Sequence, residues 1–68
     1  MKLSARNIIR GKIVGVVKGK TTAHVRLDVN GTIITSAITN EAVDELGLKK
    51  GMSAAAVVKA SDVMIAVE

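Results

Sequence analysis

Two short polar segments carry most of the side chains that could bind an anion. Near the start, Ser4-Ala5-Arg6-Asn7 offers a hydroxyl, a guanidinium and an amide in one stretch. Near the end, Lys59-Ala60-Ser61-Asp62 offers an ammonium and a second hydroxyl. With the backbone N–H groups these are nearly all hydrogen-bond donors, which suit an oxyanion that presents acceptor oxygens. Either segment alone is also typical of a solvated terminus or of an ordinary turn between strands.

The amino end of an expected helix is a third candidate for anion binding. Thr39 and Asn40 stand at its start, where unpaired N–H groups and the helix dipole favour negative charge. Every helix has such an end, so this feature gains weight only in combination with the two polar segments.

Catalysis and direct cation binding are not expected. The chain has one histidine and no cysteine, so a zinc ion would need carboxylates for its other ligands. His24 alternates with Thr22, Arg26 and Asp28 on a polar strand face, which is typical of a solvated histidine. No nucleophile is paired with a base in the sequence. The sequence therefore predicts a binding protein and not an enzyme.

The size and composition predict an oligomer. A chain of 68 residues without cysteine buries little surface by itself, and association with other copies is the remaining means of stabilising it. The composition is 49% hydrophobic but contains no aromatic residue, so the core must consist of aliphatic side chains. The net charge of +4 favours anionic partners in general. No apolar segment has the length of a signal sequence or membrane span, so we expect a cytoplasmic protein without membrane contact.

Apolar periodicity predicts three strands, one short helix and two further strands. Asn30-Gly31 is a strong hairpin signal, Thr39 or Asn40 can cap the helix, and Gly47 can end it. Gly11 and Gly15, four residues apart, are expected on one face of the first strand, where they would mark bends or close backbone approach. The expected elements are strands at Ile8–Lys18, Thr22–Val29 and Thr32–Ile38, a helix at Thr39–Gly47, and strands at Ala54–Ala60 and Val63–Val67.

This order of elements is that of an all-β, OB-like five-stranded barrel with one short helix, formed by a single domain over residues 1–68. The first strand has apolar residues on both faces: Ile9, Ile13 and Val17 on one, and Ile8, Val14 and Val16 on the other. The last strand, Val63–Val67, is also apolar on both faces. An apolar outer face predicts contact with another chain.

The motifs SARN, GKIVGVVKG, TSAIT, ELGL and KKGMSAAAVVKASDVMIAV, which together cover essentially the whole chain, resemble the molbindin (molybdenum-pterin-binding protein) family and its Mop or TOBE domains. The resemblance implies an OB-like fold, a hexamer built as a trimer of dimers, and oxyanion sites between subunits. It implies contacts with molybdate or tungstate from the residues that align with the family motifs, namely Ser4, Arg6, Lys59 and Ser61.

The resemblance is incomplete at the helix. Some relatives carry a serine in its first turn, where this chain has Ala42, so that position offers no side-chain hydroxyl. Backbone N–H groups near Thr39 and Asn40 would remain as donors. Relatives also have a second kind of site near a threefold axis, and the donor-rich turn at Gly19, Lys20 and Thr22 is the place where we expect it.

The chemistry of molybdate suits a shell made of donors. Molybdate is a tetrahedral dianion with four acceptor oxygens and no proton to donate, so it needs N–H and O–H donors and positive charge. Hydrogen phosphate carries a proton that a donor-only shell leaves unpaired, at a cost of about 1–3 kcal/mol. Sulfate must be excluded mainly by size.

Two other classes of protein stay open at this point. OB folds also bind single-stranded nucleic acid, but such proteins stack bases on aromatic side chains, which this chain lacks. A structural assembly module without any ligand would explain the apolar strands equally well. The sequence does not distinguish storage from delivery of molybdenum, molybdate from tungstate, or a pterin-bound from a pterin-free role.

Overall fold

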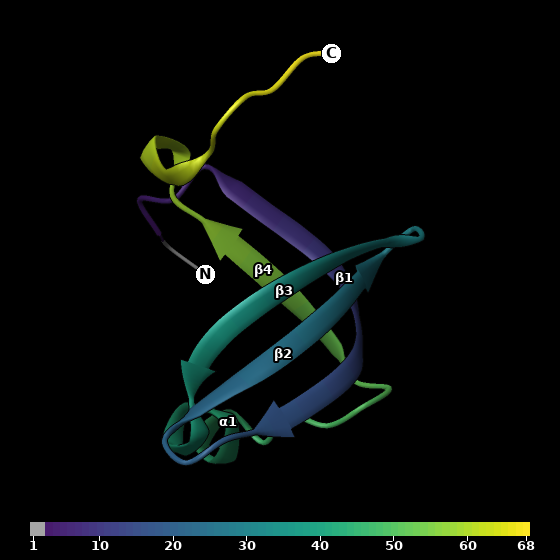
Figure 1. Ribbon diagram of the computed structural model, residues 1–68, viewed down its shortest axis with the longest axis vertical. Helices are drawn as coiled ribbons and strands as arrows, with labels where there is room; N and C mark the ends of the chain where they lie inside the picture. Colours follow the sequence, from purple (N-terminus) through teal and green to yellow (C-terminus); the bar gives the residue numbers. More distant parts are fainter. Residues whose placement is uncertain (1–2) are drawn as a thin grey trace.

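The computed structural model describes residues 3–68, and they form a strongly bent antiparallel sheet with a short helix at one end (Figure 1). The sheet has four strands in the order β3-β2-β1-β4. The prediction of an all-β fold with one short helix is therefore confirmed. The elements are β1 (Asn7–Lys18), β2 (Thr22–Val29), β3 (Thr32–Thr39), α1 (Asn40–Leu46), β4 (Ser53–Val58) and a single 3₁₀ turn, η1 (Ala60–Asp62).

A bulge in the long strand β1 changes which side chains face inward. The pairing with β2 shifts between Ile13, opposite Leu27, and Gly15, opposite Arg26. An extra residue in one strand reverses the alternation of faces beyond it. The prediction that Val17 shares a face with Ile13 is therefore wrong, because Val17 lies on the outer face of the bent sheet, opposite His24, and is 66% exposed.

The same bulge separates the two glycines of β1. Gly11 precedes it and approaches the backbone of β2 so closely that an added Cβ would lie 2.4 Å from the carbonyl oxygen of Asp28. Gly15 follows it, and a Cβ there would meet only the side chain of Arg26, at 3.8 Å. The expected close backbone approach is confirmed at Gly11, whereas the expectation that both glycines lie on one face is wrong.

The predicted turn and cap residues have the expected conformations. Asn30 and Gly31 both have positive φ in the β2–β3 hairpin. Thr39 caps α1 by accepting a hydrogen bond from the N–H of Ala42 at 3.0 Å. Gly47 ends the helix with φ 63° and ψ 37°, a left-handed conformation that costs glycine little.

The core is small and aliphatic. Its buried members come from β1, β2 and α1, so the concave side of the sheet is filled at the helix end and less filled at the other end. Such a core stabilises a chain of this length only modestly. The buried residues are Ile13, Ala23, Val25, Leu27 and Val43.

The predicted fifth strand is not formed by the single chain. Residues Val63–Val67 pair with no strand, and Figure 1 shows them running away from the sheet beyond η1. The predicted strand Ala54–Ala60 is likewise shorter, because β4 ends at Val58 and η1 follows. The sheet therefore stays open between its two edge strands, β3 and β4. A strand requires a neighbour with unpaired backbone groups, and the tail leaves η1 in a direction that reaches neither edge.

Candidate functional site

The pairing of β1 with β4 brings the two polar segments together. Asn7 begins β1 and lies opposite Val58, which ends β4. The side-chain amide of Asn7 also donates a hydrogen bond to the carbonyl oxygen of Val58 at 3.2 Å. Arg6 comes directly before this pair and Lys59 directly after it, so residues more than fifty positions apart in sequence lie at one end of the sheet. We call this end, where β1 begins and β4 ends, the β1–β4 end.

The turn η1 presents the second segment. Lys59 caps it, and the N–H of Asp62 donates to the carbonyl oxygen of Lys59 at 2.9 Å. The N–H groups of Ala60 and Ser61, at the start of this turn, have no intrahelical acceptor, as at the start of any helix. Two backbone donors and the Ser61 hydroxyl therefore lie within three residues of the Lys59 ammonium.

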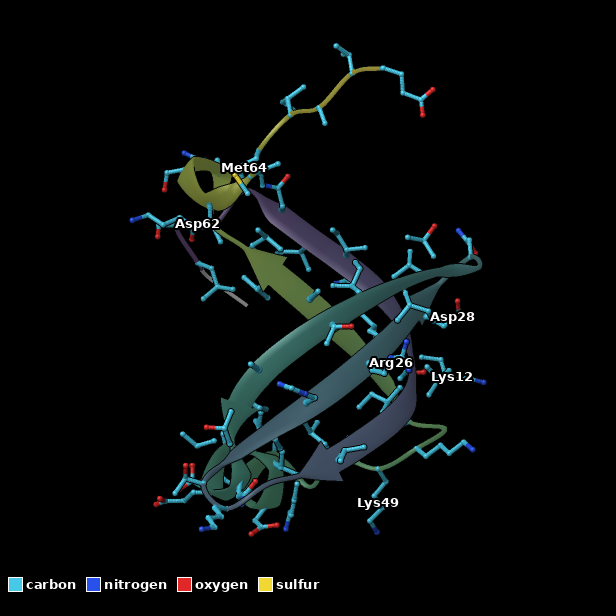
Figure 2. The ribbon with its side chains drawn as sticks, in the orientation of Figure 1. Lys12, Arg26, Asp28, Lys49, Asp62 and Met64 are labelled. Atoms are coloured by element: carbon cyan, nitrogen blue, oxygen red, sulfur yellow. The ribbon has the colours of Figure 1, made fainter. Side chains whose placement is uncertain are left out.

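The site is open to solvent in the single chain. Ser4, Arg6, Lys59 and Ser61 are all exposed, and Ala5 and Asn7 are half-buried. Water and salt weaken attraction between exposed charges and an anion. Asp62, to which sequence reasoning gave no role, adds a carboxylate at the same end of the molecule (Figure 2). Tight anion binding here therefore requires a further surface that covers the donors.

The other predicted site residues lie at the opposite end of the sheet. Thr22 and Thr39 pair with each other where β2 begins and β3 ends, next to α1 (Figure 1). Because β1 runs the length of the molecule between the two ends, one chain does not bring Thr39 or Asn40 to Arg6 and Lys59. The sequence-predicted shell is thus split into two groups.

Several donors at the helix end are already bonded within the chain. The backbone N–H of Asn40 donates to Thr21 O, and its side-chain amide donates to Gly19 O, both at 2.8 Å. The N–H of Gly19 donates to Thr22 O at 2.8 Å. The side-chain oxygen of Asn40 is buried without a hydrogen-bond partner among the described residues. Lys20 and the Thr22 hydroxyl are predicted donors that make no hydrogen bond to another of the described residues.

Residues 3–68 contain no cluster of three or more histidine, cysteine or acidic side chains that could hold a metal ion. His24 faces outward between Val17 and Ala37 on the neighbouring strands. The donor set at the β1–β4 end therefore suits an intact anion and offers no cation ligands comparable to a zinc site.

Comparison with known proteins defines the class. The TOBE domain model matches residues 3–65, which take in all four strands, the helix and the polar segments at the β1–β4 end. The chain is therefore a TOBE domain.

Small proteins of about the same length are among its relatives. Molybdenum-pterin-binding protein 2 of Clostridium pasteurianum is 52% identical over 66 residues, which cover 96% of this chain and 97% of the relative. The chain belongs to this family of molybdenum-pterin-binding proteins. Among the described residues, no helix is long and apolar enough to cross a membrane.

Two solved structures share the fold. A molybdate-binding protein from Sporomusa ovata superposes with a TM-score of 0.95 at 34% identity, covering 98% of this chain and all of that one. ModG, described as a cytoplasmic molybdate-binding protein and crystallised with molybdate bound, gives a TM-score of 0.89 at 52% identity. The match covers 94% of this chain but 46% of ModG, whose chain is longer.

Proposed function

We propose that this protein binds molybdate, and tungstate as the equivalent tetrahedral dianion, between subunits of a cytoplasmic homo-oligomer. The observation that carries this function is the convergence of Ser4-Ala5-Arg6-Asn7 with Lys59-Ala60-Ser61 at one end of the sheet. The molybdate-binding relatives, ModG with bound molybdate among them, support the same ligand. The role is binding and not catalysis, with molybdenum storage or homeostasis as its purpose.

The two charged side chains and the hydroxyls have distinct roles in this site. Arg6 and Lys59 supply the positive charge that compensates a dianion withdrawn from water. Ser4 and Ser61 donate neutral hydrogen bonds, as do the N–H groups of the η1 turn. Such a shell accepts an oxyanion that carries no proton and disfavours hydrogen phosphate.

The proposal of an oligomer rests on the separation of the predicted anion-binding residues into two groups at opposite ends of the sheet. Thr39 and Asn40 lie at the opposite end of the sheet, so they reach the donors of the β1–β4 end only when a second copy contributes them. The Asn40 N–H is bonded to Thr21 O, so its share in binding requires a bifurcated or rearranged hydrogen bond. We propose a hexamer built as a trimer of dimers, in which each 68-residue chain is one domain and completes a five-stranded barrel. The turn at Gly19, Lys20 and Thr22 remains our proposal for a second site.

The outer face of the sheet does not favour a nucleic acid partner. Lys12 lies opposite Asp28 in the β1–β2 ladder, and Figure 2 shows Arg26 beside them on the same side. The carboxylate of Asp28 offsets part of the positive charge, and the chain has no aromatic side chain on which a base could stack. We therefore propose neither a nucleic acid nor a membrane partner.

The direct test is calorimetry on one preparation of the oligomer. Molybdate and tungstate are expected to bind, whereas sulfate, phosphate and a single-stranded oligonucleotide are expected to bind far more weakly or not at all. Lys49→Met is the matched control variant, because Lys49 lies on an exposed turn away from the β1–β4 end (Figure 2). Failure of the intact oligomer to bind molybdate would overturn the proposed function.

A further inference from the structure

Asp62 places a carboxylate among the proposed oxyanion donors. Lys59 is the amino-terminal cap of η1 and Asp62 is the third residue of the turn, so they are three positions apart. The N–H of Asp62 donates to the carbonyl oxygen of Lys59 at 2.9 Å and closes the turn. Side chains at the cap and at the third position of a helical turn are neighbours, as in a capping box. The turn therefore holds a carboxylate near the Lys59 side chain, at the β1–β4 end (Figure 2).

The carboxylate of Asp62 makes neither a salt bridge nor a hydrogen bond with another of the described residues. A carboxylate in the first turn of a helix is favoured by the unpaired N–H groups there, which in η1 are those of Ala60 and Ser61. It also attracts a nearby ammonium. The proposed function assigns these same N–H groups and the Lys59 ammonium to the oxyanion. Asp62 and the oxyanion therefore compete for one set of donors.

The charge at the site falls short of what a dianion requires. Arg6 and Lys59 each carry a positive charge and Asp62 carries a negative one, so the net charge of these three side chains is +1. Molybdate and tungstate each carry two negative charges. Neighbouring side chains on one turn lie well within the screening length of about 8–10 Å at physiological ionic strength. The negative charge of Asp62 therefore acts on an anion bound at η1, and more strongly where an interface excludes water.

We propose that Asp62 is a specificity-determining residue of the oxyanion site, which lowers the affinity for tetrahedral dianions and reduces their advantage over monoanions of the same shape. It does so as a fixed negative charge beside Lys59 and the free N–H groups of η1. This inference rests on the proposed function, because it assigns Asp62 to the same site. A site restrained in this way gives up its ligand at a higher free concentration than one with Arg6 and Lys59 alone.

The charge of the ligand separates this role from a structural one. The energy of an anion beside a fixed charge is proportional to the charge of the anion. Removal of the Asp62 charge should therefore favour a dianion twice as much in free energy as a monoanion, so the gain in dianion affinity is the square of the gain in monoanion affinity. A change in the geometry of η1 alone would alter the binding of both anions by similar factors.

Calorimetry of the intact oligomer with tungstate, a dianion, and perrhenate, a tetrahedral monoanion, tests the role of Asp62. Asp62→Asn keeps the size of the side chain and removes its charge. It is expected to raise the affinity for tungstate about fivefold or more and that for perrhenate only about twofold, and added salt should shrink both gains. Asp28→Asn is the matched control. It removes the same charge from the outer face of β2, and its amide oxygen can still accept the hydrogen bond from the Gly31 N–H.

Asp62→Glu, which restores the charge, should bind both anions like the parent. If light scattering shows that Asp62→Asn has lost oligomer mass, Asp62→Ser serves as the second neutral variant. Tungstate affinity in the neutral variant that is equal to or below that of the parent would overturn the inference, and so would equal gains for tungstate and perrhenate. A parent oligomer that binds neither tungstate nor molybdate would instead overturn the proposed function.

Discussion

At the scale of single residues, the molecule collects donors that are far apart in sequence. The register that places Asn7 opposite Val58 sets Arg6 and Lys59 beside the same end of the sheet. Neither cation forms a salt bridge with a carboxylate among the described residues. The salt bridge that those residues do contain joins Lys18 to Asp44, at the helix end of the sheet. Positive charge at the β1–β4 end is thus left for a ligand or for a neighbouring chain.

Replacement of Arg6 by alanine should weaken molybdate binding by about 1.5–3 kcal/mol, because charge-assisted hydrogen bonds are lost. Folding should change little, since Arg6 is exposed. Calorimetry gives the affinity, and Arg10→Ala, an exposed arginine four residues along the chain, is the matched control. Unchanged affinity in Arg6→Ala would exclude this side chain from the site. A joint fall in affinity and oligomer mass would instead assign it to the interface.

Lys59→Met should abolish most of the binding while the oligomer persists. Methionine keeps an apolar stem but removes the charge that compensates the dianion, and an uncompensated charge costs more than a missing neutral hydrogen bond. Ser61→Ala should therefore have the smaller effect, about 0.5–1.5 kcal/mol. Titration of both variants beside Lys49→Met measures the order. Molybdate binding by Lys59→Met at the affinity of the parent would refute the placement of the site at η1.

At the scale of elements, β1 positions both ends of the molecule. It pairs with β2 and with β4. Next to its bulge, it is also bonded to the loop before β4: the N–H of Ile13 donates to Met52 O, and the N–H of Gly51 donates to Ile13 O. The bulge increases the local bend of the strand. The sheet can curl around a small core because β1 bends at this point.

Gly11→Ala should destabilise the fold by about 1–3 kcal/mol, because the new methyl group would collide with the backbone of Asp28. Gly15→Ala should be far milder, because its Cβ would meet only the flexible side chain of Arg26 at an ordinary contact distance. Urea unfolding at matched protein concentration measures both. Equal losses of stability in the two variants would contradict the close approach at Gly11.

At the scale of the whole molecule, a single chain leaves much apolar surface uncovered. Besides the tail, Ile8 and Val57 face each other across the outer side of β1 and β4, and both are more than a third exposed. Surface of this kind, together with a five-residue core, indicates a chain whose stability depends on association.

Light scattering should therefore give a particle of about six times the chain mass of 7.1 kDa. Because association stabilises the folded chain by mass action, the midpoint of thermal unfolding should rise with protein concentration. Molybdate should raise it further. A monomer at micromolar concentration would remove both the interfaces and the shared sites, and a midpoint independent of concentration would show that association contributes little to stability.

The sequence by itself determined the local structure and the chemistry. Alternation of apolar and polar residues located β2, and the Asn30-Gly31 hairpin signal located β3. Thr39 and Gly47 located the ends of the helix, and donor-rich segments identified the candidate site. These features depend on neighbours along the chain, where residue type and spacing suffice.

Only the tertiary structure decided which distant segments meet. The bulge near Val14 moved Val17 to the outer face, because one unpaired residue reverses every later side chain and leaves no periodic signal of its own. The predicted strand Val63–Val67 has strand-like residues, but a strand also requires a partner edge, which one chain does not present to it. The β1–β4 register joined Arg6 to Lys59 and separated both from Asn40, since long-range pairing is set by how the sheet closes and not by local sequence.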